Sequence, residues 1–172
     1  MEQRAAKLFP VEYFHVVFTL PDTFNSLALA SERVVYNTLF HAVSHTLLEV
    51  AANPKRLGAR IGFIGILHTW GQSLSLHPHV HCVVPGGGLS PDRHRWIACR
   101  PGFFLPIRIL SRVFCGKFIG GLRKAFEAGI RFGQLELARH VILPLANASD
   151  SNEMYQSEYD YVDKIIRDAT QK

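Results

Sequence analysis

The residues in this sequence best suited to chemistry are the histidines of the run His77-Pro78-His79-Val80-His81. Val80 and the residues 82–84 that follow favour a β-strand, in which alternate side chains share one face. Such a strand places the imidazoles of His79 and His81 side by side and points Val80 and Cys82 into a core. Two neutral imidazoles at this spacing can chelate one divalent metal ion and leave positions open for substrate oxygens.

The alternative is a surface strand in which two histidines alternate by chance. His77 on the same face, and the small or apolar residues downstream, make a metal site about as good an interpretation as a surface strand. A third ligand can come from His77 or from His68, which lies in a second predicted strand, 62–70. The short connection between the strands fits an antiparallel hairpin, and one register puts His68 beside His79, whereas a one-residue slip turns it away. We favour His68 slightly, because a neighbouring strand can close the chelate from the side.

Composition indicates one domain, or one domain with an appendage. The chain has 172 residues, of which 48% are hydrophobic, enough to bury a sizeable core. No apolar run approaches the length of a membrane span, and the N-terminus lacks a signal-peptide pattern. The three cysteines are an odd number without the paired spacing of zinc ligands, so we expect reduced thiols in a cytosolic protein.

The charge is unevenly distributed along the chain. Residues 1–149 carry 16 Lys and Arg against 8 Asp and Glu, and residues 150–172 carry 3 against 6. The net charge is therefore +8 in the body and −3 in the tail. A basic body permits a nucleic-acid partner without requiring one.

The hydrophobic pattern predicts four strands and two long helices. We expect strands at 14–20, 62–70, 77–85 and 96–98, and helices at 31–52 and 106–128. This order predicts an α+β fold, a ferredoxin-like split βαβ antiparallel sheet with helices on one face. The histidine face is then the uncovered one. The second helix carries the basic residues that we consider candidates for DNA binding: Arg108, Arg112, Lys117, Arg123 and Lys124.

Four separate segments resemble the HUH-type, two-tyrosine transposases of rolling-circle insertion sequences. They are residues 11–21, 65–72, 77–90 and 100–106, and they occur in the order found in that family. The resemblance covers roughly residues 10–133. It implies an HUH endonuclease core in which His79-Val80-His81 is the family's HUH motif, with Mg²⁺ or Mn²⁺ as cofactor. Imidazole ligands suit Mn²⁺ better than Mg²⁺, which prefers oxygen.

The resemblance implies DNA transposition by metal-assisted cleavage and joining of single-stranded DNA. In this reaction a tyrosine hydroxyl attacks a backbone phosphate, leaving a 5′-phosphotyrosine link and a free 3′-OH. Two alternatives are a non-catalytic single-stranded DNA-binding remnant, and a related replication initiator or histidine-metal hydrolase. The implied partners are single-stranded DNA and either further copies of this chain or an intact transposase copy. The implied location is the bacterial cytoplasm, at the nucleoid when bound to DNA, and no membrane is involved.

The sequence departs from the family at both ends, which suggests a copy truncated at both ends and inactive by itself. We expect the core at residues 1–145 and an acidic amphipathic helix or tail at 146–172. Tyr155 and Tyr159 have the i, i+4 spacing of a nucleophile pair, but neighbouring carboxylates would repel a phosphate and raise the pKa of a phenol. We therefore favour a packing role for both tyrosines. Tyr13 and Tyr36 lie among apolar residues and are expected in the core.

Overall fold

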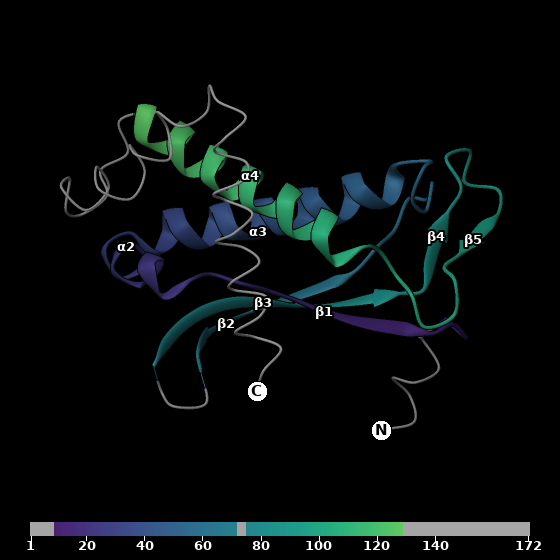
Figure 1. Cartoon of the computed structure of the whole chain (residues 1–172), viewed down its shortest axis with the longest axis horizontal. Helices are drawn as coiled ribbons and strands as arrows, with labels where there is room; N and C mark the ends of the chain where they lie inside the picture. The colour runs from purple at the N-terminus through teal and green to yellow at the C-terminus, as the bar shows by residue number, and fades with distance from the viewer. Residues whose placement is uncertain (1–8, 72–74, 129–172) are drawn as a thin grey trace.

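The computed structural model describes residues 9–71 and 75–128, and within them it contains a three-stranded sheet, a two-stranded sheet and a layer of helices (Figure 1). The elements in chain order are β1 (Tyr13–Thr19), the 3₁₀ turn η1 (Asp22–Phe24), α2 (Asn25–Ala30), α3 (Glu32–Ala52), β2 (Ile64–Trp70), β3 (Leu76–Pro85), β4 (Gly87–Leu89), β5 (Trp96–Ala98) and α4 (Ile107–Glu127). The expected tail at 146–172 lies outside the described residues.

The main sheet is antiparallel throughout, with β3 in the centre and β1 and β2 at its edges. The helices α3 and α4 both lie on one side of it (Figure 1). This arrangement confirms the predicted α+β class, with an antiparallel sheet and helices on one face. The other face of the sheet carries the odd-numbered residues of β3, which include all three of its histidines.

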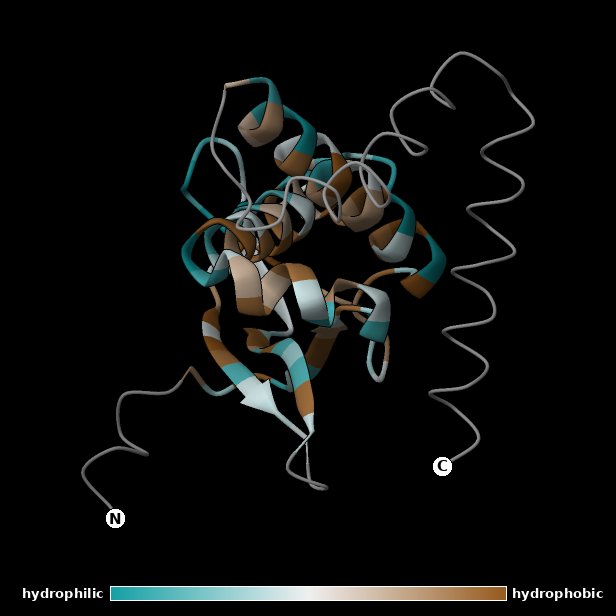
Figure 2. Cartoon of the chain, turned by 90° about the vertical axis from the view of Figure 1, so that its left-hand side faces the viewer, coloured by the Kyte–Doolittle hydropathy of each residue, from teal (hydrophilic) through white to brown (hydrophobic). Residues whose placement is uncertain are grey.

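The core fills the space between the sheet and the helices. Val80, Cys82 and Val84 of β3 are fully buried, as the alternation of the strand predicts. They belong to one cluster with the predicted stripes of both long helices, and the strands are correspondingly banded by hydropathy in Figure 2. The buried stripes are Val35, Leu39, Val43, Leu47 and Val50 of α3, and Leu110, Phe114, Phe118 and Leu122 of α4. Ala125, expected in the second stripe, is only half-buried.

The predicted strand at 96–98 forms, but it does not join the main sheet. It pairs instead with Gly87–Leu89 in a separate two-stranded sheet. Pro85 ends β3, and Gly87 then adopts a φ of +154°, a conformation that side chains rarely permit. A Cβ at Gly87 would lie 2.5 Å from the carbonyl oxygen of Ile97. The glycines therefore let β4 leave the direction of β3 and approach β5 closely.

The two long helices touch closely at one point. A Cβ on Gly121 of α4 would lie 2.6 Å from Cγ2 of Thr38 on α3, whereas a Cβ on the neighbouring Gly120 would meet nothing within 4 Å. Gly121 therefore sets the separation of the helices here. None of the helices in the described ranges has the length and apolar character needed to cross a membrane.

Candidate metal centre

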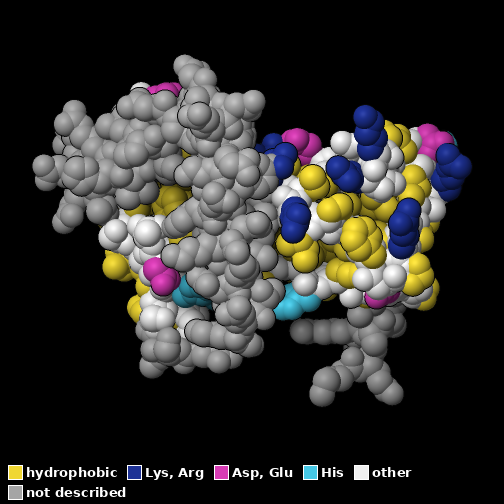
Figure 3. All heavy atoms as spheres, viewed as in Figure 1, with side chains coloured by type: hydrophobic (Ala, Val, Ile, Leu, Met, Phe, Trp, Pro, Cys, Tyr) yellow, Lys and Arg dark blue, Asp and Glu magenta, His cyan; other side chains and the backbone are white. Residues whose placement is uncertain are grey.

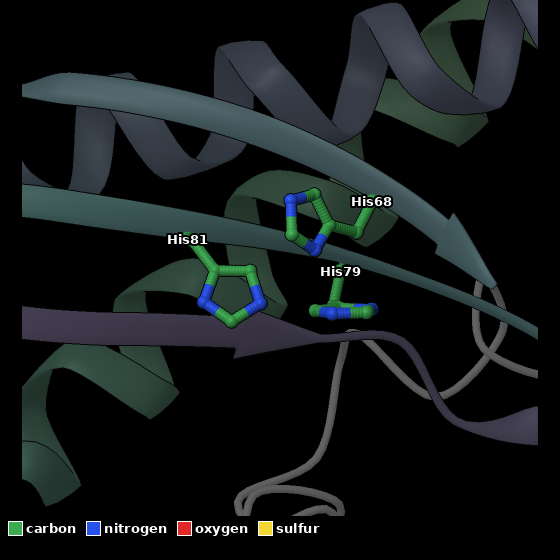
Figure 4. Close-up of side chains that lie close together, drawn as sticks. All are labelled: His68, His79 and His81. Carbon is green, nitrogen blue, oxygen red and sulfur yellow. The ribbon is translucent and has the colours of Figure 1, made fainter. Parts of the chain in front are cut away.

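The pairing of β2 with β3 settles the register that brings the histidines together. His68 lies directly opposite His79, and Ile66 lies opposite His81. Residues paired in this way share a face, so His68, His79 and His81 all stand on the face of the sheet that the helices leave open. Their rings turn toward one another in Figure 4.

The three rings are close enough to share one ion. The ring centroid of His68 lies 5.3 Å from that of His79 and 4.5 Å from that of His81. The centroids of His79 and His81 are 4.8 Å apart. One nitrogen from each ring lies within 4.8 Å of the other two. His77 is not part of this group, and its Nδ1 lies 3.8 Å from Oδ1 of Asp22. The geometry thus favours His68 as third ligand, and metal binding itself remains a prediction.

One hydrogen bond fixes the tautomer of His79. Its Nδ1 lies 2.5 Å from the carbonyl oxygen of His77. Because a carbonyl oxygen only accepts, Nδ1 carries the proton and donates it. The lone pair of Nε2 is then free to bind a metal ion, which is the usual arrangement of metal-ligating histidines.

His15 of β1 is a fourth histidine at this site, and the sequence analysis missed its role. It lies opposite Val83 and therefore diagonal to His81. Its Nε2 is 2.7 Å from Nδ1 of His81, and the two rings stack with centroids 4.9 Å apart. Strand alternation alone places His15 on the face away from the core; the missing information was that β1 pairs with β3.

The surroundings of His81 favour its neutral form. Partial burial lowers the pKa of His81 below its usual range, and the nearby His79, His68 and His15 lower it further. A neutral imidazole has the lone pair that a metal ion requires. His81 is therefore ready to bind a metal ion at neutral pH without first losing a proton.

The open face around the histidines is largely apolar. Four exposed hydrophobic side chains share it: Val17 of β1, Ile64 and Ile66 of β2, and Val83 of β3. Such an exposed apolar patch is typical of a binding surface.

Tyr13 is half-buried and lies outside the core, which corrects its expectation, whereas Tyr36 is half-buried but packs against the core, as expected. The Tyr13 hydroxyl accepts a 2.9 Å hydrogen bond from the backbone N–H of Phe9. Tyr36 belongs to α3 on the opposite side of the sheet, where burial and the charge of Glu32 raise its pKa. Neither hydroxyl is directed at the histidines. Tyr155 and Tyr159 lie outside the described residues.

The predicted DNA-binding residues of α4 belong to the helix layer, on the side of the sheet away from the histidines. Arg108, Arg112 and Lys124 are exposed, and Lys117 and Arg123 are partly covered. Lys117 forms a 2.6 Å ion pair with Glu49 of α3. Their binding to DNA stays a prediction, and Arg108, at the start of α4, lines one pocket with His15 and Val17 of β1.

Comparison with known proteins gives a consistent family. Residues 62–158 match the family model Y2_Tnp, described as "Putative transposase". The match continues past residue 145, the expected end of the core, and includes Tyr155. The chain is 56% identical over 129 residues to the "Putative transposase y4qJ" of Sinorhizobium fredii, covering 75% of this chain and 32% of that protein. It is 45% identical over 76 residues to the "Transposase for insertion sequence element IS801" of Pseudomonas savastanoi pv. phaseolicola, covering 44% of this chain and 18% of that protein.

Solved structures of the conjugative relaxase TrwC share the fold. A metal-bound complex with oriT DNA superposes with a TM-score of 0.51 at 17% identity, covering 64% of this chain and 42% of that chain. A metal-free complex with oriT DNA gives a TM-score of 0.52 at 17% identity, covering 64% and 43%. The chain thus spans about a third, or less, of the length of the curated relatives named above and under half of these relaxase chains.

Proposed function

The chain belongs to the Y2_Tnp family of transposases, and from that premise we propose that it serves DNA transposition by metal-assisted cleavage and joining of single-stranded DNA. The observation that carries the proposal is the convergence of His68, His79 and His81 on the open face of the sheet. A divalent ion held there would polarise a phosphate oxygen and offset the negative charge that a nucleophile must approach.

The histidines are held in place before any ligand arrives. His79 is fixed through Nδ1 by the carbonyl of His77, and His81 is fixed through Nδ1 by His15. If His81 donates in this second bond, its Nε2 is left to bind the ion, as it is in His79. We therefore assign His15 the role of a positioning residue. Ligands oriented in this way need little rearrangement when the ion binds.

Of the two expected ions, Mn²⁺ suits three imidazoles better. Mg²⁺ prefers oxygen ligands and keeps several waters, whereas Mn²⁺, a transition metal, accepts imidazole nitrogen more readily. We propose Mn²⁺ first and Mg²⁺ second. Both leave positions for phosphate oxygens beside three histidine ligands.

The nucleophile that this reaction requires is a tyrosine hydroxyl. The candidates in this chain are Tyr155, inside the matched segment 62–158, and Tyr159, one residue beyond it. An intact copy of the transposase is the other source. The acidic residues around Tyr155 and Tyr159 favour the second source, because they would repel the incoming phosphate.

A second candidate function is single-strand binding without cleavage. It is favoured by the position of the described tyrosines, since Tyr13 bonds to Phe9 and Tyr36 lies in the helix layer. The two functions differ in their use of metal. A catalytic site holds the phosphate through the ion, whereas a simple binding surface relies on basic and aromatic side chains.

Fluorescence anisotropy of a labelled oligonucleotide, measured with and without Mn²⁺, tests the proposal. We expect Mn²⁺ to strengthen binding of the single strand, and we expect His79→Ala/His81→Ala to remove this gain without abolishing metal-free binding. His41→Ala/His45→Ala is the matched control, because it removes an exposed pair of histidines on α3. An affinity that is equal with and without Mn²⁺ would favour the non-catalytic function.

A further inference from the structure

A pocket of about 610 Å³ lies at the end of the open sheet face next to β4 and β5. Its floor includes Tyr13, Ile64 and Val83, which stand on the same face as the histidines. Val83 follows His81 by two residues in β3, so the floor of the pocket begins about 7 Å along the strand from the candidate metal site. The pocket and the histidines therefore belong to one continuous surface.

Aromatic rings form the walls of this pocket. Trp96 of β5 stands against the backbone of Gly87, where an added Cβ would lie 2.6 Å from the indole Nε1, and the residue as a whole is 37% exposed. Phe9 packs beside it with ring centroids 5.7 Å apart. Phe63 lines the pocket from the segment before β2. The backbone of β4 thus lies against an indole that is partly open to solvent.

The rim of the pocket is basic. Arg60 and Arg93 line it and are exposed. The two segments that supply them, residues 53–60 and 90–100, contain six Lys and Arg and a single acidic residue, Asp92. Hydrogen bonds from the Ser90 hydroxyl and the His94 N–H engage that carboxylate. On the visible face of the molecule, Figure 3 shows Lys and Arg spaced among hydrophobic side chains in the half that carries β4 and β5.

From this combination we infer that the pocket holds one unpaired nucleobase of the single strand whose phosphate lies at the histidines. Aromatic rings stack on the face of any base, and arginines at the rim bind the adjoining phosphates. The positive rim matches a polyanion and disfavours an apolar protein segment as occupant. The inference rests on the proposed function and adds to it a place where the strand is held beside the cleavage site.

The test is an abasic scan measured in EDTA, so that metal plays no part. A set of oligonucleotides, each lacking one base, is bound to the Trp70→Phe variant, which leaves Trp96 as the one tryptophan. We expect a roughly tenfold loss of affinity at a single position, together with loss of Trp96 fluorescence quenching by that oligonucleotide. In Trp96→Ala the intact oligonucleotide should bind about tenfold more weakly, and the abasic penalty at that position should vanish.

A second variant tests the pocket without removing a large aromatic side chain. Arg60→Gln keeps the backbone pairing of residue 60 with Leu89 and should lower the slope of log affinity against log salt by about one. Arg33→Gln, an exposed arginine on α3, removes the same charge from the helix layer and should leave the slope unchanged.

The possible results separate the two proposals. Tight binding with a flat abasic profile, and no change in Trp96→Ala or Arg60→Gln, overturns the pocket and leaves the proposed function standing. If Trp96→Ala changes only the oligomeric state, from dimer to monomer, then a second copy of the chain occupies the pocket. This result also overturns the inference. Absence of single-strand binding by the unmodified chain overturns both.

Discussion

One hydrogen bond between Nε2 of His15 and Nδ1 of His81 couples the tautomers of the two rings. When His81 donates from Nδ1, its Nε2 lone pair faces outward; without His15 both tautomers are available. We predict that His15→Ala lowers Mn²⁺ affinity by about 10- to 100-fold. His15→Gln, whose amide oxygen can accept the same bond, should restore much of it.

Calorimetric Mn²⁺ titrations, together with nitrogen NMR shifts of the His81 ring, check this prediction. The NMR shifts report the tautomer directly, which a role in packing alone would not change. An unchanged His81 tautomer and unchanged affinity in His15→Ala would remove His15 from the account.

His81 also makes the stability of the metal-free chain depend on pH. Its pKa is lowered in the folded state, chiefly by burial, so the unfolded chain takes up this proton at a higher pH than the folded chain. The free energy of unfolding should therefore fall as the pH drops through the ordinary histidine pKa of about 6.5. Urea unfolding of the wild type and His81→Gln on both sides of that pH should show a shallower decline in the variant. An identical decline in the two proteins would contradict the prediction.

At the scale of elements, the contact between α3 and α4 depends on one of two adjacent glycines. Alanine is the better helix former, so Gly120→Ala should raise the free energy of unfolding by about 0.5–1 kcal/mol. Gly121→Ala should lower it by about 1–3 kcal/mol because the new methyl group meets Thr38. Denaturant unfolding measures both changes.

A substitution of Thr38 tests whether the stability loss in Gly121→Ala comes from this contact. Thr38→Ala removes the methyl group that Gly121→Ala would strike, so the double variant should recover part of the lost stability. Equal stabilisation by both glycine substitutions would show that the helices are not in contact there.

The elements and the core were largely predictable because they follow from local patterns. Alternation in β3 predicted which of its residues are buried, and the spacing of apolar residues predicted the buried stripe of α3. Which strands pair, and in which register, was harder to predict. The sequence left the register of His68 open, missed the contact of His15 with His81, and did not reveal that Trp96–Ala98 forms a separate sheet. These features depend on which distant segments meet, and no local periodicity records that.

At the scale of the whole molecule, the source of the nucleophile determines what this chain can do alone. Tyr155 and Tyr159 lie in an acidic segment; among the described tyrosines, the Tyr13 hydroxyl bonds to the N–H of Phe9 and Tyr36 lies in the helix layer. We predict that the chain alone forms no covalent adduct with single-stranded DNA, even with Mn²⁺. A 3′-labelled oligonucleotide on a denaturing gel is the appropriate probe, because a 5′-phosphotyrosine link retains the 3′ fragment. An adduct that disappears in Tyr155→Phe or Tyr159→Phe would restore this chain as a complete nuclease.

We propose that the open face of the sheet holds a divalent metal ion through its histidines, and a Mn²⁺ titration tests this proposal most directly. The wild type and His41→Ala/His45→Ala should bind one Mn²⁺ ion with the same affinity, since that pair lies on the helix layer. His79→Ala/His81→Ala should lose specific binding while keeping its circular dichroism spectrum, because neither side chain belongs to the core. Equal Mn²⁺ affinity in the wild type and His79→Ala/His81→Ala would contradict the account.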